Sequence, residues 1–293
     1  MARKITCTNE DGISVIFTDS FSPWLLENCD GIYETRNSVS TSENTMTDGS
    51  TYQGSVTTMR NIVLTLRDTA EDEKHQANRA LLYALFKPKS DGLFVYEENG
   101  LTRQIAYKVE YVTIDSVPRS RRATVSLLCP DPYFVDPEDI IVQMSSWVSQ
   151  FEFQHEFVSG GEEFGYRVEE RIKTIYNESA SDYIGITITI DAAGPATNPK
   201  VTHVEQNESI EVGTTGNPLN LLFGDKLIIT THTNNKHVYL ERGGVREEIN
   251  EYLSEDSEFL QLMHGENTFG YEADSGVNNL TVTISFRYRY PGV

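Results

Sequence analysis

Short runs rich in β-branched and aromatic residues, some of them alternating between apolar and polar positions, fill much of the first 130 residues. In the run at 103–115, Ile105, Tyr107 and Val109 alternate with polar neighbours. A period of two places every second side chain on the same face of a strand, so such a strand has one buried and one wetter face. Five strands are predicted here, at 13–18, 56–67, 92–98, 103–115 and 121–129.

One helix is predicted in the same half, between Asp68 and Pro88. Asp68 is a suitable N-cap with Glu71 three residues later, and Pro88 closes the far end. Apolar residues recur there at spacings of three and four, which makes one stripe that should face a core. The stripe consists of Ala77, Ala80, Leu81, Ala84 and Leu85. One helix laid on a mostly antiparallel sheet indicates an α+β domain.

The polar stretch 34–54 interrupts this pattern, with turn-forming Asp-Gly pairs at 30–31 and 48–49. A loop of this length inside a compact domain is either functional or in fact a hairpin. The sequence leaves both alternatives open.

The second half has no helix of comparable quality. Strands are predicted at 166–175, 182–190, 201–205, 208–212, 226–231, 236–241, 245–250 and 280–290. The last run alternates throughout, from Leu280 to Tyr290, which favours one long half-buried strand. Turn signals separate the runs at intervals typical of a sandwich, so we expect an all-β sandwich or jelly roll. The segment 151–165 fits poorly and is interpreted as a hairpin or a projecting arm.

Between the halves, the segment "LLCPDPYFVDPEDI" contains Pro130, Pro132 and Pro137. Proline lacks the N–H that a strand ladder needs, so the prolines must end the preceding strand. We therefore predict three parts in succession: an N-terminal domain over 1–130, a proline-rich junction at 131–140 and a C-terminal domain over 141–293. Tyr133 and Phe134 should pack against one of the two domains.

The chain's 293 residues suffice for about two domains, and its formal charge is −20. Residues 1–130 carry 14 Lys and Arg against 17 Asp and Glu, a net charge of −3, and residues 131–293 carry 10 against 27, a net charge of −17. A nucleic-acid-binding surface needs clustered Lys and Arg, so the charge argues against one. The first residues contain no signal-peptide core and no run approaches a membrane span, so folding in the cytosol of the producing cell is expected.

Catalytic and cofactor motifs are absent from the sequence: we find no nucleophile elbow, zinc-protease helix, phosphate-binding loop or dinucleotide fingerprint. No catalytic, cofactor-binding or metal-binding residue is therefore assigned. Cys7, Cys29 and Cys129 are too scattered for a disulfide framework or a metal site, and are expected to be buried free thiols.

Several other residues and segments can be interpreted either as structural or as parts of a functional site. His232 and His237, in "THTNNKH", favour a polar hairpin over a metal or sugar site, because no carboxylate or cysteine stands at ligand spacing. Trp24 and Trp147 favour core positions over sugar stacking. The acidic clusters favour solvated surface over a hidden glycosidase pair, and "DPYFVDPED" lacks the calcium-loop pattern.

The order of these elements resembles the distal tail proteins of long-tailed, siphovirus-like bacteriophages. The N-terminal resemblance is carried by "DGIY", "RNIVLTL", "LFKP", "YEENGL", "AYKVEYVTI" and "CPDPYF". The C-terminal resemblance is carried by "FGDKLIITTHTNNKHVYLERGG" at 223–244 and by 262–293, in which a G-x-N-x-F-x-Y turn is expected to lead into the final strand.

The resemblance implies a hexameric ring at the tail tip of a virion, assembled in the host cytoplasm. It implies a tail-tube-like N-terminal domain, an antiparallel sheet or split barrel with one helix, around a DNA channel, and a galectin-like C-terminal sandwich directed outward. The implied partners are the tail tube, the tail-tip hub or tail-associated lysin, and receptor-binding proteins, with passing DNA as non-specific cargo. No cofactor, membrane or enzymatic activity is implied.

Three alternatives stay open. The C-terminal domain could bind a cell-wall saccharide, although "HTNNKH" resembles a galectin sugar site only weakly and has no nearby tryptophan. The chain could serve a tail-like bacteriocin, or could be a cell-wall hydrolase with a hidden carboxylate pair. For the ring, we expect residues 34–54 to pair across the subunit interface, because long loops and free strand edges need a neighbour.

Overall fold

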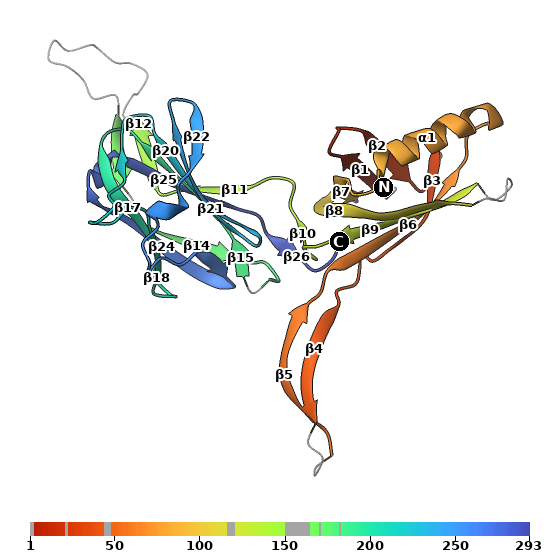
Figure 1. Cartoon of the computed structure of the whole chain (residues 1–293), viewed down its shortest axis with the longest axis horizontal. Helices are drawn as coiled ribbons and strands as arrows, with labels where there is room; N and C mark the ends of the chain where they lie inside the picture. Colours follow the sequence, from red (N-terminus) through yellow and green to blue (C-terminus); the bar gives the residue numbers. More distant parts are fainter. Residues whose placement is uncertain are drawn as a thin grey trace. The chain divides into compact units, whose positions relative to one another are not determined.

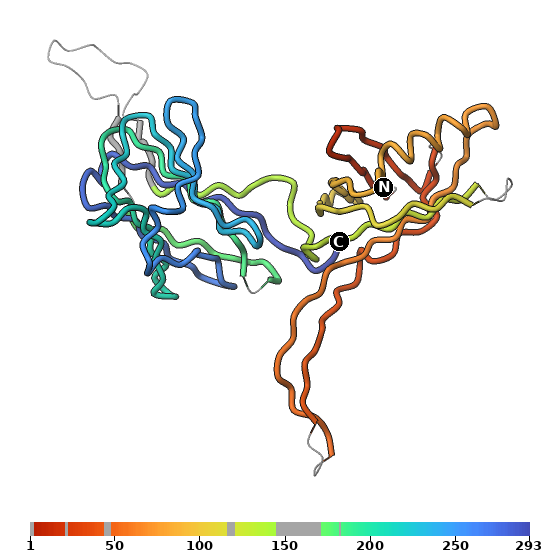
Figure 2. The backbone as a smooth tube through the Cα atoms, viewed as in Figure 1, coloured from red at the N-terminus to blue at the C-terminus, as the bar shows by residue number. Residues whose placement is uncertain are grey.

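The computed structural model describes residues 3–20, 23–43, 48–115, 121–149, 165–169, 171–181 and 183–293. It is mostly β and divides into two compact units (Figures 1 and 2). The first unit comprises Met1–Pro137 with Arg289–Val293, and the second comprises Glu138–Tyr288. Residues 289–293 thus depart from the predicted domain 141–293, because they pair with the first unit.

The first unit is built on one sheet in the order β26-β10-β8-β7-β1-β2-β3-β6-β9, and β8 also pairs with β9, so the sheet closes on itself. Its strands are β1 (Lys4–Asn9), β2 (Ser14–Thr18), β3 (Trp24–Asp30), β6 (Arg60–Asp68), β7 (Asp91–Glu98), β8 (Leu101–Ile114), β9 (Arg122–Cys129), β10 (Phe134–Val135) and β26 (Arg289–Tyr290). The pairings are antiparallel except for one parallel bridge between β2 and β3. Alternate side chains fill one core, which includes Phe17, Trp24, Phe94 and Tyr107.

Helix α1 (His75–Leu85) packs on this sheet after a short 3₁₀ turn at Asp72–Lys74. The predicted apolar stripe is wrong in its rotation: Leu82 and Leu85 are buried, whereas Ala77, Ala80 and Leu81 are exposed. On the observed face Leu82 and Leu85 are buried together with Phe86, the residue that follows the helix, and these three large side chains remove more apolar area from water than two leucines and three alanines would.

Asp68 does not cap α1, because it lies at the end of β6. Its carboxylate is instead hydrogen-bonded to the backbone N–H of Ala70 and to the side chains of His75 and Asn78.

The stretch predicted as a polar loop is a β-hairpin, formed by β4 (Asn37–Glu43) and β5 (Ser50–Thr57). The predicted strand 56–67 is consequently two strands, since β5 ends at Thr57 and β6 begins at Arg60. β1 and β3 were not predicted. Tyr133 and Phe134 both pack on the first unit, and Phe134 is fully buried there.

The second unit contains two larger antiparallel sheets that share one core. One has the order β11 (Ile140–Gln143), β25 (Leu280–Phe286), β16 (Thr187–Ala192), β20 (Lys226–His232), β21 (Asn235–Arg242) and β22 (Val245–Glu248). The other has the order β14 (Ile172–Asn177), β24 (Gly265–Ser275), β17 (Ala196–His203) and β18 (Glu208–Glu211), with β19 (Asn220–Leu221) also paired to β17. Two short pairs complete it, β12 (Ser145–Ser149) with β13 (Gly165–Glu169) and β15 (Tyr183–Gly185) with β23 (Gln261–Met263).

Two predictions about the end of the chain are wrong. The run 280–290 is not one strand, because β25 ends at Phe286 in the second unit and β26 belongs to the first. The expected turn near 265–271 is part of the long strand β24, which pairs with β14 on one side and β17 on the other.

The predicted strand 182–190 is divided into β15 and β16. The segment 151–165 lies outside the described residues, apart from Gly165 at the start of β13.

Candidate functional site: a projecting hairpin and its root

The hairpin of β4 and β5, residues 37–57, leaves the closed sheet of the first unit and projects away from it (Figure 1, orange). Its ladder runs from Asn37 opposite Thr57 to Glu43 opposite Ser50, with a bulge near Ser40. Every residue of β4 is exposed, and no residue of the hairpin belongs to the core. We call it the projecting hairpin.

Apart from the bulge near Ser40, the projecting hairpin lacks the features that usually protect a strand edge. Natural edges are blunted by lysine, proline or a covering element, whereas residues 37–57 contain no Lys, Arg or Pro. Val39, Tyr52 and Val56 expose 57%, 63% and 72% of their surface. An isolated two-stranded hairpin is marginally stable in water. The arrangement therefore suits a strand or surface of another protein chain.

The hairpin starts and ends at a root, residues 31–36 and 57–60, that Arg60 holds from inside. Arg60 is 5% exposed, and its guanidinium lies 4.9 Å from the ring centroid of Phe134. Its N–H groups donate to four backbone carbonyls. The acceptors are Pro132 at 2.7 Å from Nε, Gly31 at 2.5 Å and Glu34 at 2.6 Å from Nη1, and Pro291 from Nη2.

The charge of Arg60 is thus satisfied by carbonyl dipoles, and none of these four acceptors is a carboxylate. Burial lowers the pKa of Arg60 from its ordinary value. Arginine nevertheless stays protonated in proteins, so a permanent cation sits at the root. The carbonyls come from three separate segments of the sequence, 31–34, 132 and 291, which makes Arg60 a cross-link of the first unit.

Side-chain hydroxyls add three more bonds at the root. Thr35 Oγ1 donates to the Pro291 carbonyl at 2.6 Å, and Thr57 Oγ1 is 3.3 Å from Tyr133 Oη. Thr58 Oγ1 donates to the Arg36 carbonyl at 3.0 Å. Gly31 has a φ of +87°, and a Cβ there would lie 2.0 Å from the Asn61 carbonyl oxygen, so only glycine fits. A cavity of about 50 Å³ beside Arg60 is lined by Glu34, Met59 and Pro132 among others, which is too small for a typical ligand.

The histidines singled out by the sequence do not form a joint site. His232 Nε2 lies 3.1 Å from Thr187 Oγ1, and His237 Nδ1 lies 2.6 Å from Glu248 Oε1. β20 and β21 form a hairpin around them, so the polar-hairpin interpretation is confirmed. Among the described residues, no group of three or more His, Cys, Asp or Glu is placed to hold a metal ion.

The tryptophans and cysteines considered in the sequence analysis are the remaining candidate residues. Trp24 is 1% exposed in the first core, whereas the side chain of Trp147 lies outside what the structure describes. The three cysteines are buried and unpaired with one another, as predicted. Burial raises the pKa of Cys29 and of Cys129 to about 12.

The junction acids are engaged in ion pairs rather than gathered in a site. Asp136 binds Arg103 at 2.5 Å and accepts from Tyr290 Oη at 3.0 Å, and Asp131 pairs with Arg289. Asp139 binds Arg287 at 2.5 Å within the second unit.

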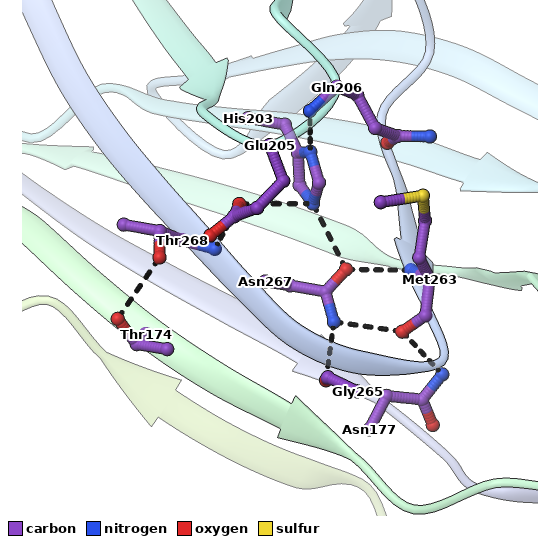
Figure 3. A network of polar contacts seen from close by, with 9 residues as sticks. All are labelled: Thr174, Asn177, His203, Glu205, Gln206, Met263, Gly265, Asn267 and Thr268. Carbon is purple, nitrogen blue, oxygen red and sulfur yellow. Dashed lines mark hydrogen bonds and ion pairs between the residues drawn. The ribbon is translucent and has the colours of Figure 1, made fainter.

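A buried polar network in the second unit escaped prediction (Figure 3). His203 is fully buried, its Nδ1 accepts from the Gln206 N–H at 3.1 Å, and its Nε2 lies 3.0 Å from Asn267 Oδ1. The Asn267 amide donates to the carbonyls of Met263 and Gly265 at 2.8 and 2.9 Å. These polar groups satisfy one another, so the network organises the bend between β23 and β24. Its sequence signal was a histidine and an asparagine at inward positions of alternating strands.

A shallow hollow of about 300 Å³ lies on the same sheet, where Gly270 stands between Ile172 and Thr202. Its aromatic member, Tyr271, is 5% exposed. The hollow therefore has no exposed ring among its lining residues on which a sugar would stack. No helix among the described residues is long and apolar enough to cross a membrane.

Residues 181–290 match the family described as the siphovirus-type tail component, C-terminal domain. This part of the chain is therefore similar to the C-terminal domain of siphovirus-type tail components. A comparison with curated proteins found no match.

The fold of the whole chain is similar to that of the Dit protein of phage SPP1, described as a paradigm of the hub adsorption apparatus in phages that infect Gram-positive bacteria. The two chains are 12% identical with a TM-score of 0.65, over 97% of this chain and 98% of that one. Chains of the activated phage P2 baseplate with calcium (12% identical, TM-score 0.55, 100% of both chains) and of the phage p2 baseplate with strontium (11%, 0.55, 99% of both) are also similar.

Proposed function

We propose that this chain is a distal tail protein that forms a homohexameric ring at the tail tip of a virion, in which the projecting hairpin of each copy contacts the next. The observation that carries the proposal is the hairpin itself, an exposed ladder with unprotected edges that contributes nothing to its own core. Edges of this kind pair with another chain, and most homo-oligomers close by symmetry.

In this ring the first unit is the tail-tube-like part, a split barrel with one helix that surrounds the DNA channel. Its net charge of −3 over residues 1–130 offers DNA no clustered cations to bind, which suits passing cargo. The second unit is a galectin-like sandwich that faces outward. The ring joins the tail tube to the tail-tip hub, or tail-associated lysin, and to the receptor-binding proteins, and its role is structural rather than enzymatic.

The test compares two matched substitutions in the full-length protein. Val56 on the hairpin and Val245 on β22 are exposed to a similar degree, 72% and 68%. Val56→Lys places a charge against the neighbouring copy and should abolish hexamers in mass photometry, because an edge lysine blocks strand pairing. Val245→Lys should leave them intact.

A second variant removes residues 38–56 and joins Asn37 to Thr57, which face each other in the ladder, through an Asn-Gly turn. Hexamers formed by this variant and by Val56→Lys alike would overturn the proposal. The saccharide-binding alternative would need binding of the full-length protein to purified cell walls that is lost on mutating His232 and His237, and the hydrolase alternative would need clearing of cell walls in a zymogram. No described observation favours either over the ring.

A further inference from the structure

The root of the projecting hairpin is held by a segment that lies far away in the sequence, residues 291–293. The Pro291 carbonyl accepts from Thr35 Oγ1 at 2.6 Å and also from Arg60. The Val293 N–H donates to the Ile32 carbonyl at 3.4 Å. The Val293 side chain packs on the core of the first unit. Residues 291–293 therefore bind the hairpin root on both sides, at 32–35 and at Arg60.

The junction segment 131–133 binds the root as well. Tyr133 is hydrogen-bonded to Thr57, where the hairpin ends, and the Pro132 carbonyl accepts from Arg60. Arg289 then links the two segments, since its guanidinium lies 4.3 Å from the Tyr133 ring centroid and pairs with Asp131. We call Arg60 and residues 131–133 and 291–293 together the root latch.

The latch matters because the hairpin has no core contacts beyond its root. The seven residues of β4 give an arm of roughly 23 Å at about 3.3 Å per residue. A rotation of roughly 10° at the root would displace its tip by roughly 4 Å, close to the spacing of about 4.8 Å between paired strands. A hairpin that is free to rotate at its root cannot hold the register of a ladder with another chain.

We propose that residues 291–293 position the projecting hairpin for a second copy of this chain, so that assembly requires the completed root latch. The inference rests on the proposed function, since the hairpin is the contact between copies. The order of these segments in the chain also determines when assembly can begin. Residues 289–293 follow the whole second unit in the sequence, so a chain still being synthesised does not yet contain them and cannot complete the latch. Premature association through the hairpin is thereby disfavoured.

The test uses full-length Thr35→Val, which removes the hydroxyl bond to Pro291 and keeps the shape of the side chain, and a variant that stops after Tyr290. Thr189→Val, on β16 of the second unit, is the matched control. In mass photometry Thr35→Val should weaken each contact between copies roughly fivefold, the value of one exposed hydrogen bond. The truncated protein, which also loses the bond to Arg60, should weaken it roughly hundredfold. Thr189→Val should match the wild type.

A second readout needs no assembly. Spin labels at Ser42→Cys on the hairpin and Thr113→Cys on β8, both exposed positions, report the hairpin's direction in the dilute monomer, since the native thiols are buried. The distance distribution should broaden in Thr35→Val and in the truncated protein, but not in Thr189→Val.

The two failures are distinguishable. A wild type that never assembles would refute the ring, while the label distances would still decide whether residues 291–293 position the hairpin. Unchanged label distances and unchanged association in Thr35→Val would overturn the latch and leave the ring intact.

Discussion

At the scale of single residues, Arg60 shows what an alternating sequence pattern can predict about a buried side chain and what it cannot. The alternation of "RNIVLTL" places Arg60 on the same face as Ile62 and Leu64, and all three are buried. A buried cation needs compensating polar groups, so the pattern predicts that Arg60 has a polar partner inside the first unit. It cannot name that partner, because the four carbonyls lie at positions 31, 34, 132 and 291 and meet only in the folded unit.

The buried thiols predict that the first unit is sensitive to alkali. Burial raises the pKa of Cys29 and Cys129 from 9.0 to about 12, and that of Cys7 is also raised by burial. Above pH 9 the unfolded thiols lose protons that the folded ones keep. Their contribution to the free energy of unfolding is therefore complete below pH 9 and is lost as the pH rises toward 12.

The thermal midpoint of unfolding, followed by circular dichroism from about pH 8 to about pH 10, should fall with pH. In Cys129→Ala the fall should be shallower, because one titrating group is gone. A parallel curve for that variant would show that other groups control the alkaline limit.

At the scale of elements, the predictions succeeded where one face of a strand is buried and the other wet. β8 and β9 follow the pattern, as do β20 and β21, because most of their inward residues are apolar and most of their outward residues are polar. β24 was missed because Asn267, an inward residue, is polar, and because Gly265 and Gly270 interrupt the apolar period. β3 was missed where a bulge after Leu26 shifts the alternation. The projecting hairpin has no buried face, so no period could reveal it.

The observed orientation of α1 can be tested with two adjacent leucines, one buried and one exposed. Leu82 is 1% exposed and Leu81 is 38% exposed. Both changes to alanine remove the same atoms and alter helix propensity equally, so their difference reports burial. Leu82→Ala should cost about 3 kcal/mol of unfolding free energy, and Leu81→Ala less than about 1 kcal/mol, measured by urea denaturation. Equal losses would instead support the stripe expected from the sequence.

At the scale of the whole molecule, the second unit is an insertion in the first. The chain leaves the first unit after Pro137 and returns at Arg289, and the two flanking strands are neighbours, since Val135 pairs with Arg289. The return to the first unit could not be predicted, because the alternation from Leu280 to Tyr290 continues across the boundary between units. Residues 280–290 read as one strand although they serve two cores.

This topology predicts that the first unit folds without the second, provided that residues 289–293 are present. Residues 138–288 would be replaced by a short Gly-Ser linker from Pro137 to Arg289, and the product compared with a chain that ends at Pro137. The shorter chain loses the contact of Arg103 with the Tyr290 ring, at 3.6 Å, and the bond from Tyr290 to Asp136. It also leaves Arg60 without the Pro291 carbonyl. The bonds of Pro291 to Thr35 and of Val293 to Ile32 are lost as well. We therefore expect the shorter chain to be less stable by at least roughly 3 kcal/mol in urea denaturation, the value of the cation–π contact and the first two hydrogen bonds alone. Equal stability of the two chains would mean that residues 289–293 are attached to the first unit without supporting its fold.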